Sequence, residues 1–449
     1  MFTLINKHKI YLIIVLFILI LGFILRRQNY DQIPLPGESR DEYSFTWLGL
    51  SLFQLGKPIA TSGLDPYNHD WQYINVDDVF HKYANPNPFP VDGPWFDHPP
   101  LFGLFAGALP YLRGYRNFAD ISTALIRKPM IFLGIINLLL IIIFSTLVFS
   151  PRVGLITGLI YATNPLFVVS SRMVQAENLL ITLFLLALIS LHYRFLWLSI
   201  SFAGLAVLVK ISGLSVCLSL IILTFIFDPK PIANSLKIFL GTFAYLIIFP
   251  IYGYFYDWSL FKAVFSTNSD RYYRDGLGGF YSLITKSNIT RDFVDGWVPF
   301  GWLSLLLLKL RPKSKYWWVV IPLFSYLVTY LIFGSHGYGW YKFPFYPFVT
   351  ILVAIAFAKL FTKYNLFTAF FALFVTGGVL VDHFYPPENL QNFMWSYRFS
   401  LLAVFLILLY SNFNPRFSKY VSWIIFISLI IINIWANFQI TPTSWYKFQ

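Results

Sequence analysis

Long apolar runs separated by short polar segments dominate this chain. Runs of about 15 to 20 hydrophobic residues can cross the roughly 30 Å hydrocarbon core of a membrane as helices. The pattern predicts an all-α integral membrane protein with about thirteen transmembrane helices in a single polytopic domain, residues 1 to 449. The runs lie near residues 10 to 25, 129 to 149, 153 to 169, 178 to 193, 195 to 209, 211 to 227, 236 to 256, 297 to 310, 316 to 333, 343 to 358, 366 to 381, 399 to 411 and 421 to 437.

The polar residue Lys210 separates two of these runs, which could be two full spans or one broken re-entrant unit. The first run is followed by Arg26 and Arg27 and lacks a small-residue cleavage site, so we expect a retained span instead of a signal peptide.

Composition agrees with the membrane interpretation. Hydrophobic residues make up 57% of the chain and charged residues 12%, whereas soluble domains have about 45 to 50% and about 25%. The formal net charge of +13 would suggest nucleic acid in a soluble protein, but in a membrane protein the location of the charges matters more than their sum, and no nucleic-acid partner is expected. The single cysteine, Cys217, excludes a disulfide framework.

The distribution of charge predicts the orientation. With the N-terminus in the cytoplasm, only Asp228 among the twenty carboxylates lies on the cytoplasmic side, as the positive-inside rule favours. The cytoplasmic connections then carry a large set of basic residues: Lys7, Lys9, Arg152, Arg194, Lys230, Lys237, Lys309, Arg311, Lys313, Lys315, Lys359, Lys363, Arg416 and Lys419.

Two long loops face outward in this orientation. The first, residues 26 to 128, is acidic and aromatic, and the second covers residues 257 to 296. The cytoplasmic connections are all short, so we expect any chemistry to use the outward loops of a multi-pass cell-membrane protein.

The start of the first loop holds a pair of carboxylates. Arg40, Asp41 and Glu42 precede the run YSFTWLGLSLFQLGK, whose helical spacing predicts an amphipathic helix at the interface. Ionised carboxylates are favoured at a helix N-terminus. The two acids could therefore be catalytic, or Asp41 could simply cap the helix.

Further along the same loop, FDHPPLFGLFAGALPYL joins Asp97 and His98 to a rigid proline pair and a second short juxtamembrane helix. His98 is either a solvated loop residue or a donor to an anionic group.

Two more segments place polar side chains at span ends. SSRMVQAENLLITL carries Arg172 and Glu177, which are costly near hydrocarbon unless they are functional or form a mutual salt bridge. The turn GSHGYGWYKFPFYP supplies Tyr338, Trp340, Tyr341 and Lys342; Lys342 could hold a phosphate or could snorkel within an aromatic belt.

Several kinds of site have no support in the sequence. The motifs GxxxxGK[ST], GxGxxG and HExxH are absent, which argues against a nucleotide-driven pump and a zincin. Asp41, Glu42 and Glu177 could hold a divalent cation, but oxygen ligands scattered over loops do not define a metal site.

Taken in order, RDEYSF, HPPLFG, RMVQAEN, VLVKISG and YKFPFYP resemble the GT-C-type membrane glycosyltransferases. The nearest group is the protein O-mannosyltransferases and lipid A aminoarabinose transferases, and the resemblance covers roughly residues 1 to 360. It implies transfer of a sugar from a polyprenyl-phosphate-linked donor in the bilayer to a hydroxyl acceptor on the extracytoplasmic face. We expect the acceptor oxygen to attack from the face opposite the lipid phosphate, which inverts the configuration.

The resemblance also implies roles for particular residues. Asp41 takes the position of the catalytic base, with Glu42 beside it, and Glu177 takes a second acidic position where many relatives have Asp. His98 would lie near the donor phosphate, which Arg172 and Lys342 could also contact. We expect the remaining loop candidates to contact substrate: Arg40, Asp97, Tyr338, Trp340 and Tyr341.

Two other functions fit a polytopic chain. A lipid or glycan transporter or flippase predicts charged residues in mid-span, whereas here only Lys210 departs from the span ends and outward loops. An O-antigen ligase or polymerase would be expected to have its large loop late in the chain. The acceptor could be a protein, a lipid or a glycan.

Overall fold

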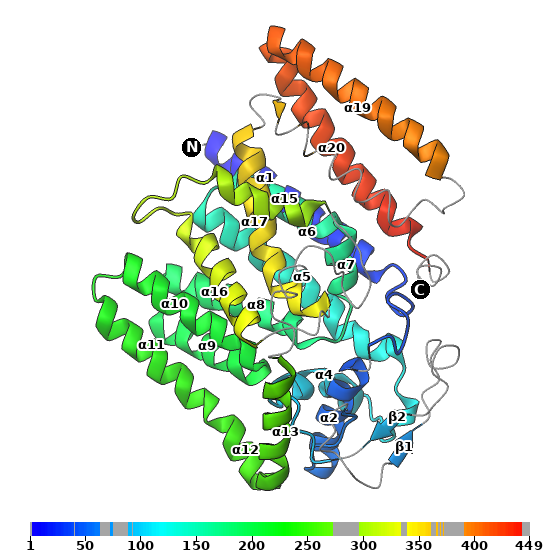
Figure 1. The fold of residues 1–449 in the computed structure, drawn as a ribbon, viewed down its shortest axis with the longest axis vertical. Coiled ribbons are helices and arrows are strands. Elements are labelled where there is room, and N and C mark those ends of the chain that lie inside the picture. The colour runs from blue at the N-terminus through cyan, green and yellow to red at the C-terminus, as the bar shows by residue number, and fades with distance from the viewer. Residues whose placement is uncertain are drawn as a thin grey trace.

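The structure, a computed structural model, describes residues 2–39, 41–62, 72–74, 89–91, 93–272, 296–333, 339–360, 365–366, 369, 371 and 390–441. Over these residues it is a bundle of helices, as predicted (Figure 1). One pair of short antiparallel strands, β1 (Gln72–Ile74) and β2 (Phe89–Val91), lies in the first loop.

Helices occupy the predicted apolar runs, except the run near 366 to 381, most of which lies outside the described residues. They are α1 (Phe2–Arg27), α5 (Thr123–Val148), α6 (Pro151–Thr163), α7 (Pro165–Ser170), α8 (Ala176–His192), α9 (Leu196–Val209), α10 (Leu214–Phe227), α11 (Pro231–Leu246), α12 (Ile248–Tyr256), α15 (Trp297–Leu303), α16 (Trp317–Phe333), α17 (Tyr346–Leu360), α19 (Leu390–Phe413) and α20 (Pro415–Gln439). One further helix, α13 (Trp258–Tyr272), lies in the second predicted loop and was not expected.

Six helical segments of the described chain are long and apolar enough to cross a membrane. They are Lys9–Arg27, Thr123–Val148, Pro231–Tyr256, Gly339–Lys359, Met394–Phe413 and Arg416–Gln439. Several shorter apolar helices, such as α8, α9 and α16, pack among them. The protein is therefore a multi-pass membrane protein, while about thirteen crossings and a cytoplasmic N-terminus stay predictions.

The break at Lys210 is present. Lys210 has extended backbone angles, φ −161° and ψ 144°, and ends α9. The 3₁₀ turn η2 (Ile211–Gly213) then leads into α10. A side chain at Gly213 would collide with the backbone of Ala206, so glycine lets the two helices fold back tightly on each other. Lys210 consequently lies at the apex of a helical hairpin.

The first loop contains both predicted juxtamembrane helices, α2 (Asp41–Leu55) and α4 (Leu101–Leu112). They cross closely because a Cβ at Gly49 of α2 would overlap the Gly103 carbonyl, and one at Gly107 would meet the α2 backbone. This is the small-residue contact that lets helix backbones approach each other.

The expected surface position of α2 is wrong. Every residue from Glu42 to Ser51 is buried. Because α2 packs against both α4 and α5, no face of that stretch is left for an amphipathic contact with the interface.

A second break separates α6 from α7 at Asn164. The Asn164 side chain accepts from the Phe167 N–H at 3.3 Å, so that N–H does not continue the helical ladder to the Thr163 carbonyl. Asn437 of α20 donates its Nδ2–H to the same carbonyl at 2.7 Å. The C-terminal helix thus satisfies the acceptor that the break exposes.

Candidate active site

The start of α2 is joined to the start of α8 through Glu42. Its carboxylate is 1% exposed and accepts from Arg127 of α5 in a bidentate pair, Nε at 2.9 Å and Nη2 at 2.6 Å. The Val174 N–H donates to Glu42 Oε1 at 3.0 Å, and Gln175 Nε2 donates to Ser39 Oγ at 2.7 Å. The N-termini of the two helices are therefore fixed against each other.

Asp41 is the first residue of α2 and is partly exposed, unlike the buried Glu42. Residues four apart share one face of a helix, so Asp41 lies on the same face as Phe45. The Phe45 ring stacks on His98 with centroids 5.5 Å apart and an interplanar angle of 18°. The Cα atoms of Asp41 and Phe45 are thus about one helical turn apart, a rise of about 6 Å.

A buried ion pair joins α8 to the apex of the α9–α10 hairpin. Lys210 Nζ lies 2.5 Å from Glu177 Oε1, with the side chains 8% and 0% exposed. The same ammonium lies 4.1 Å from the centroid of the Tyr341 ring, close enough for a cation–π contact. Lys210 is therefore held between a carboxylate and an aromatic face.

Arg172 and Glu177 do not form the alternative salt bridge considered from the sequence, because Glu177 pairs with Lys210. Arg172 is 2% exposed and donates from Nε to the Arg26 carbonyl at 3.1 Å and from Nη2 to the Leu25 carbonyl at 2.6 Å. Burial, together with the charges of Arg127 and Arg26, lowers the pKa of Arg172 to about 9. The group still carries its charge at neutral pH.

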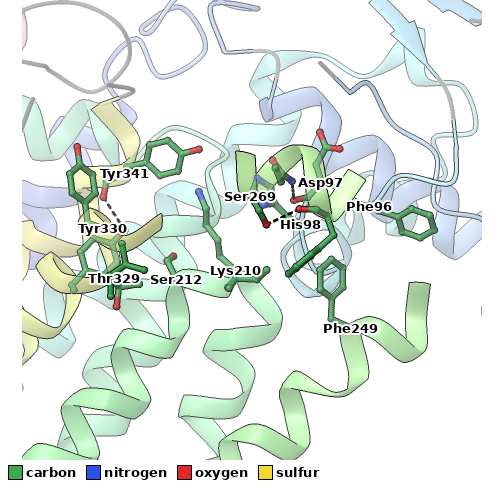
Figure 2. A pocket seen from close by; sticks show the side chains of 15 residues that line it. Phe96, Asp97, His98, Lys210, Ser212, Phe249, Ser269, Thr329, Tyr330 and Tyr341 are labelled. Atoms are coloured by element: carbon green, nitrogen blue, oxygen red, sulfur yellow. Dashed lines mark hydrogen bonds between the residues drawn. The ribbon is translucent and has the colours of Figure 1, made fainter. Parts of the chain in front are cut away.

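A cavity of about 160 Å³ opens beside this pair (Figure 2). It is enclosed by the segment before α4, the hairpin apex, α12, α13, α16 and the 3₁₀ helix η4 (Gly339–Phe345). Figure 2 shows Lys210 rising between Tyr330 and Tyr341 on one side and Asp97 and His98 on the other. The lining is mixed: Phe96, Ile211, Phe249, Phe265 and Ile332 are apolar, and Asp97, His98, Lys210, Ser212, Asn268, Ser269, Tyr326, Thr329, Tyr330 and Tyr341 carry polar groups.

Both loops contribute to the positions of Asp97 and His98. Ser62 Oγ lies 2.9 Å from each carboxylate oxygen of Asp97, and Asn268 of α13 donates to the Asp97 carbonyl at 3.1 Å. His98 also meets the edge of Trp95, with centroids 5.9 Å apart. These contacts hold the two side chains at the wall of the cavity.

The predicted aromatic turn contributes one wall. Trp340 and Lys342 are buried in η4, at 6% and 4% exposure, and Tyr341 lines the cavity. The Tyr326 hydroxyl donates to the Tyr341 carbonyl at 2.9 Å and links η4 to α16. Two predicted substrate contacts, Arg40 and Tyr338, lie outside the described residues.

The structure thus brings Asp97, His98 and Tyr341 together around one cavity. The other described candidates lie outside its lining: Asp41, Glu42, Arg172, Glu177, Trp340 and Lys342. In the part of the chain that the structure describes, no group of three His, Cys, Asp or Glu side chains could hold a metal ion. Two of the considered ligands, Glu42 and Glu177, are paired with cationic side chains.

Sequence reasoning missed two residues. Lys210 was the one ionisable group away from the span ends, and that exception was the signal that it belongs to the site. Arg127 gave no such signal, because it directly precedes the apolar run near 129 to 149 and resembles any flanking cation.

Residues 97–254 match the family described as dolichyl-phosphate-mannose-protein mannosyltransferase, a segment that contains His98, Glu177 and Lys210. No curated protein matches the chain as a whole or in part.

Two solved structures are similar. ArnT from Cupriavidus metallidurans, bound to undecaprenyl phosphate, is 13% identical with a TM-score of 0.50, and the match covers 98% of this chain and 78% of that one. The archaeal oligosaccharyltransferase AglB from Archaeoglobus fulgidus is 12% identical with a TM-score of 0.46, covering 93% and 56%. The predicted resemblance to GT-C-type membrane glycosyltransferases is confirmed, because a mannosyltransferase family matches residues 97–254 and the chain shares the fold of ArnT.

Proposed function

We propose that this protein is a membrane glycosyltransferase that moves a sugar from a polyprenyl-phosphate donor to a hydroxyl acceptor on the extracytoplasmic face. One observation carries the proposal. The half-buried carboxylate at the start of α2 lies on the helix face that contacts His98, and His98 lines a cavity into which Lys210 projects. A proton acceptor, Asp41, and two hydrogen-bond donors for a phosphate, His98 and Lys210, thereby lie at the same end of the bundle.

In this mechanism Asp41 is the general base. It accepts the proton of the acceptor hydroxyl while that oxygen attacks the anomeric carbon and the bond from that carbon to the lipid phosphate oxygen breaks. Attack from the opposite face inverts the configuration. General-base catalysis of this kind contributes about 10²- to 10⁴-fold.

The leaving phosphate gains negative charge, and positioned cations stabilise it. His98 and Lys210 line the cavity and would make the direct contacts, while Arg172 and Lys342 are buried and lie outside the cavity lining. Each well-placed donor of this kind is typically worth about 3 kcal/mol in the transition state.

For Glu42 we propose a positioning role in place of the catalytic role expected from the sequence. Its two carboxylate oxygens accept from Arg127, and one of them also accepts from the Val174 N–H. A carboxylate fully engaged in a buried pair has no free oxygen to accept a substrate proton. Its contacts instead fix the direction of α2, and with it the position of Asp41.

The cavity wall suits a lipid-linked sugar. Phe96, Phe249 and Phe265 offer apolar faces for a sugar ring or the first isoprene units, and Tyr330, Thr329 and Ser212 offer hydroxyls. ArnT, which shares the fold, was solved with undecaprenyl phosphate bound. We therefore expect a polyprenyl phosphate as the carrier.

The test is turnover by purified protein with a panel of polyprenyl-phosphate sugars, measured as donor consumption and slow donor hydrolysis. Asp41→Asn and Asp41→Ala should reduce turnover by about 100-fold or more. Asp120→Asn, which removes an exposed carboxylate elsewhere in the first loop, should leave it unchanged.

The outcomes separate two failures. Near wild-type turnover in both correctly inserted Asp41 variants would remove Asp41 from the catalytic role. Failure of the wild type with every donor would contradict the glycosyltransferase assignment and favour a lipid transporter.

A further inference from the structure

The end of the bundle opposite the cavity carries a cationic turn. α16 runs from Trp317 to Phe333, and Tyr330 near its C-terminus lines the cavity. The thirteen-residue step from Trp317 to Tyr330 covers about 20 Å of helix. The linker before α16, residues 308 to 316, therefore lies well away from the site already described and projects as a loop between α15 and α16 in Figure 1.

This linker exposes four cations, Lys309, Arg311, Lys313 and Lys315. The Arg311 carbonyl accepts from the Ser314 N–H at 3.0 Å and from Trp317 Nε1 at 3.0 Å. We call Lys309 to Ser314 the basic turn; the two hydrogen bonds pin it to the start of α16.

Two exposed cations lie beside the basic turn, Lys315 in the same linker and Lys359 of α17. Lys315 Nζ lies over the Phe149 ring at 5.5 Å. Lys359 Nζ lies over the Tyr316 ring at 4.6 Å and donates to the Leu307 carbonyl at 3.3 Å. The sequence from 296 to 360 contains no Asp or Glu, so these charges have no acidic neighbour along that stretch of chain.

Apolar side chains project beside the cations. Leu306 is 82% exposed and Leu310 is 44% exposed, and they flank Lys309 in sequence. Exposed leucines next to exposed cations are typical of a surface at the membrane boundary, where the leucines insert among the acyl chains and the cations contact the headgroup phosphates.

We propose that the basic turn binds the headgroup of an anionic phospholipid in the adjacent leaflet, with Leu306 and Leu310 against its acyl chains. Clusters of Lys and Arg beside a membrane span attract anionic lipid, and each charge near the surface raises the affinity about fivefold. These cations could instead serve only to orient the chain in the membrane, but that role requires charge and no fixed geometry. A headgroup site requires a fixed geometry, and the hydrogen bonds from Ser314 and Trp317 hold the turn in one.

The experiment measures binding of phosphatidylglycerol against phosphatidylcholine to the full-length protein in detergent, by native mass spectrometry. The triple variant K309Q/R311Q/K313Q should reduce the preference for phosphatidylglycerol by at least fivefold. The matched control K57Q/R113Q/R116Q removes three exposed cations of the first loop and should keep the preference. Equal preference in the two triple variants would overturn the proposal.

A second measurement needs no variant. The Debye length falls from about 30 Å at 0.01 M salt to about 3 Å at 1 M, so the wild-type preference should fall steeply over that range. A preference that does not change with salt contradicts a headgroup site. Complete displacement of the lipid by soluble glycerol phosphate would also contradict it, since a leaflet lipid is retained by its acyl chains as well.

Discussion

Lys210→Met should destabilise the protein more than any other single change at the Glu177–Lys210 pair. The substitution keeps the length of the side chain and removes its charge, so the carboxylate of Glu177 loses its cation. That carboxylate is 0% exposed, and within the described chain its Oε2 has no hydrogen-bond partner. Removing one partner of a buried pair typically costs about 3 to 5 kcal/mol, because the other charge is left uncompensated.

Glu177→Gln should cost less. Lys210 lines the cavity and still faces the Tyr341 ring, so its ammonium can reach water in the cavity when the carboxylate is lost. We expect about 1 to 3 kcal/mol, the cost of a buried polar group with an impaired partner. The double variant should recover part of the loss, with a coupling energy of about 2 kcal/mol, since residues in one ion pair are not additive.

The assay is reversible unfolding in mixed micelles, followed by tryptophan fluorescence, for the wild type, both single variants and the double variant. Turnover is measured in parallel, because Lys210 should also be needed for the donor phosphate. The pair does not stabilise the protein as the structure indicates if the free energy of unfolding of Lys210→Met is within about 0.5 kcal/mol of the wild type. The same conclusion follows if the losses of the two single variants simply add in the double variant.

Three further changes test other contacts. Gly107→Ala should cost about 1 to 3 kcal/mol, because its Cβ would press on the backbone of α2, whereas Ala108→Val on the same helix should cost under about 1 kcal/mol in the same unfolding assay. Asn437→Leu leaves the Thr163 carbonyl without its α20 donor and should cost about 1 to 3 kcal/mol, while Phe438→Leu, exposed beside it, should change stability by less than about 0.5 kcal/mol. Arg127→Lys cannot reproduce the bidentate pair with Glu42; it should lower turnover through a displaced Asp41, and unchanged turnover would contradict the positioning role of Glu42.

Much of the fold could be predicted from one sequence because membrane helices have a strong signal. Runs of apolar residues must form helices in hydrocarbon to satisfy their own backbone groups, so their positions follow from composition alone. The polar residue Lys210 indicated a break between two apolar runs, and helical spacing and the proline pair indicated the two helices of the first loop. The burial of α2 was not, because it depends on Gly49, Gly103 and Gly107 meeting across two helices, and no pattern within one helix indicates its partner.

The candidate site could be predicted only in part. Asp97, His98 and Tyr341 came from local motifs, and they do meet around one cavity. The pairing of ions did not follow from sequence. Arg172 and Glu177 are five positions apart, yet Glu177 pairs with a lysine 33 positions away and Arg172 with carbonyls at the end of α1. Tertiary distance, which spacing does not report, decides which charges meet.

The hairpin that carries Lys210 also determines the depth at which chemistry would take place. α9 and α10 contain 14 residues each, about 21 Å of helix, which is about 9 Å less than the hydrocarbon thickness. In the proposed orientation the leaflet beside the hairpin must thin, or the lipid phosphate must sink, for the two to meet. Such hydrophobic mismatch would make the rate of sugar transfer depend on the acyl-chain length of the surrounding lipids. The donor phosphate would then move toward the bilayer centre to reach Lys210, and would not leave the bilayer.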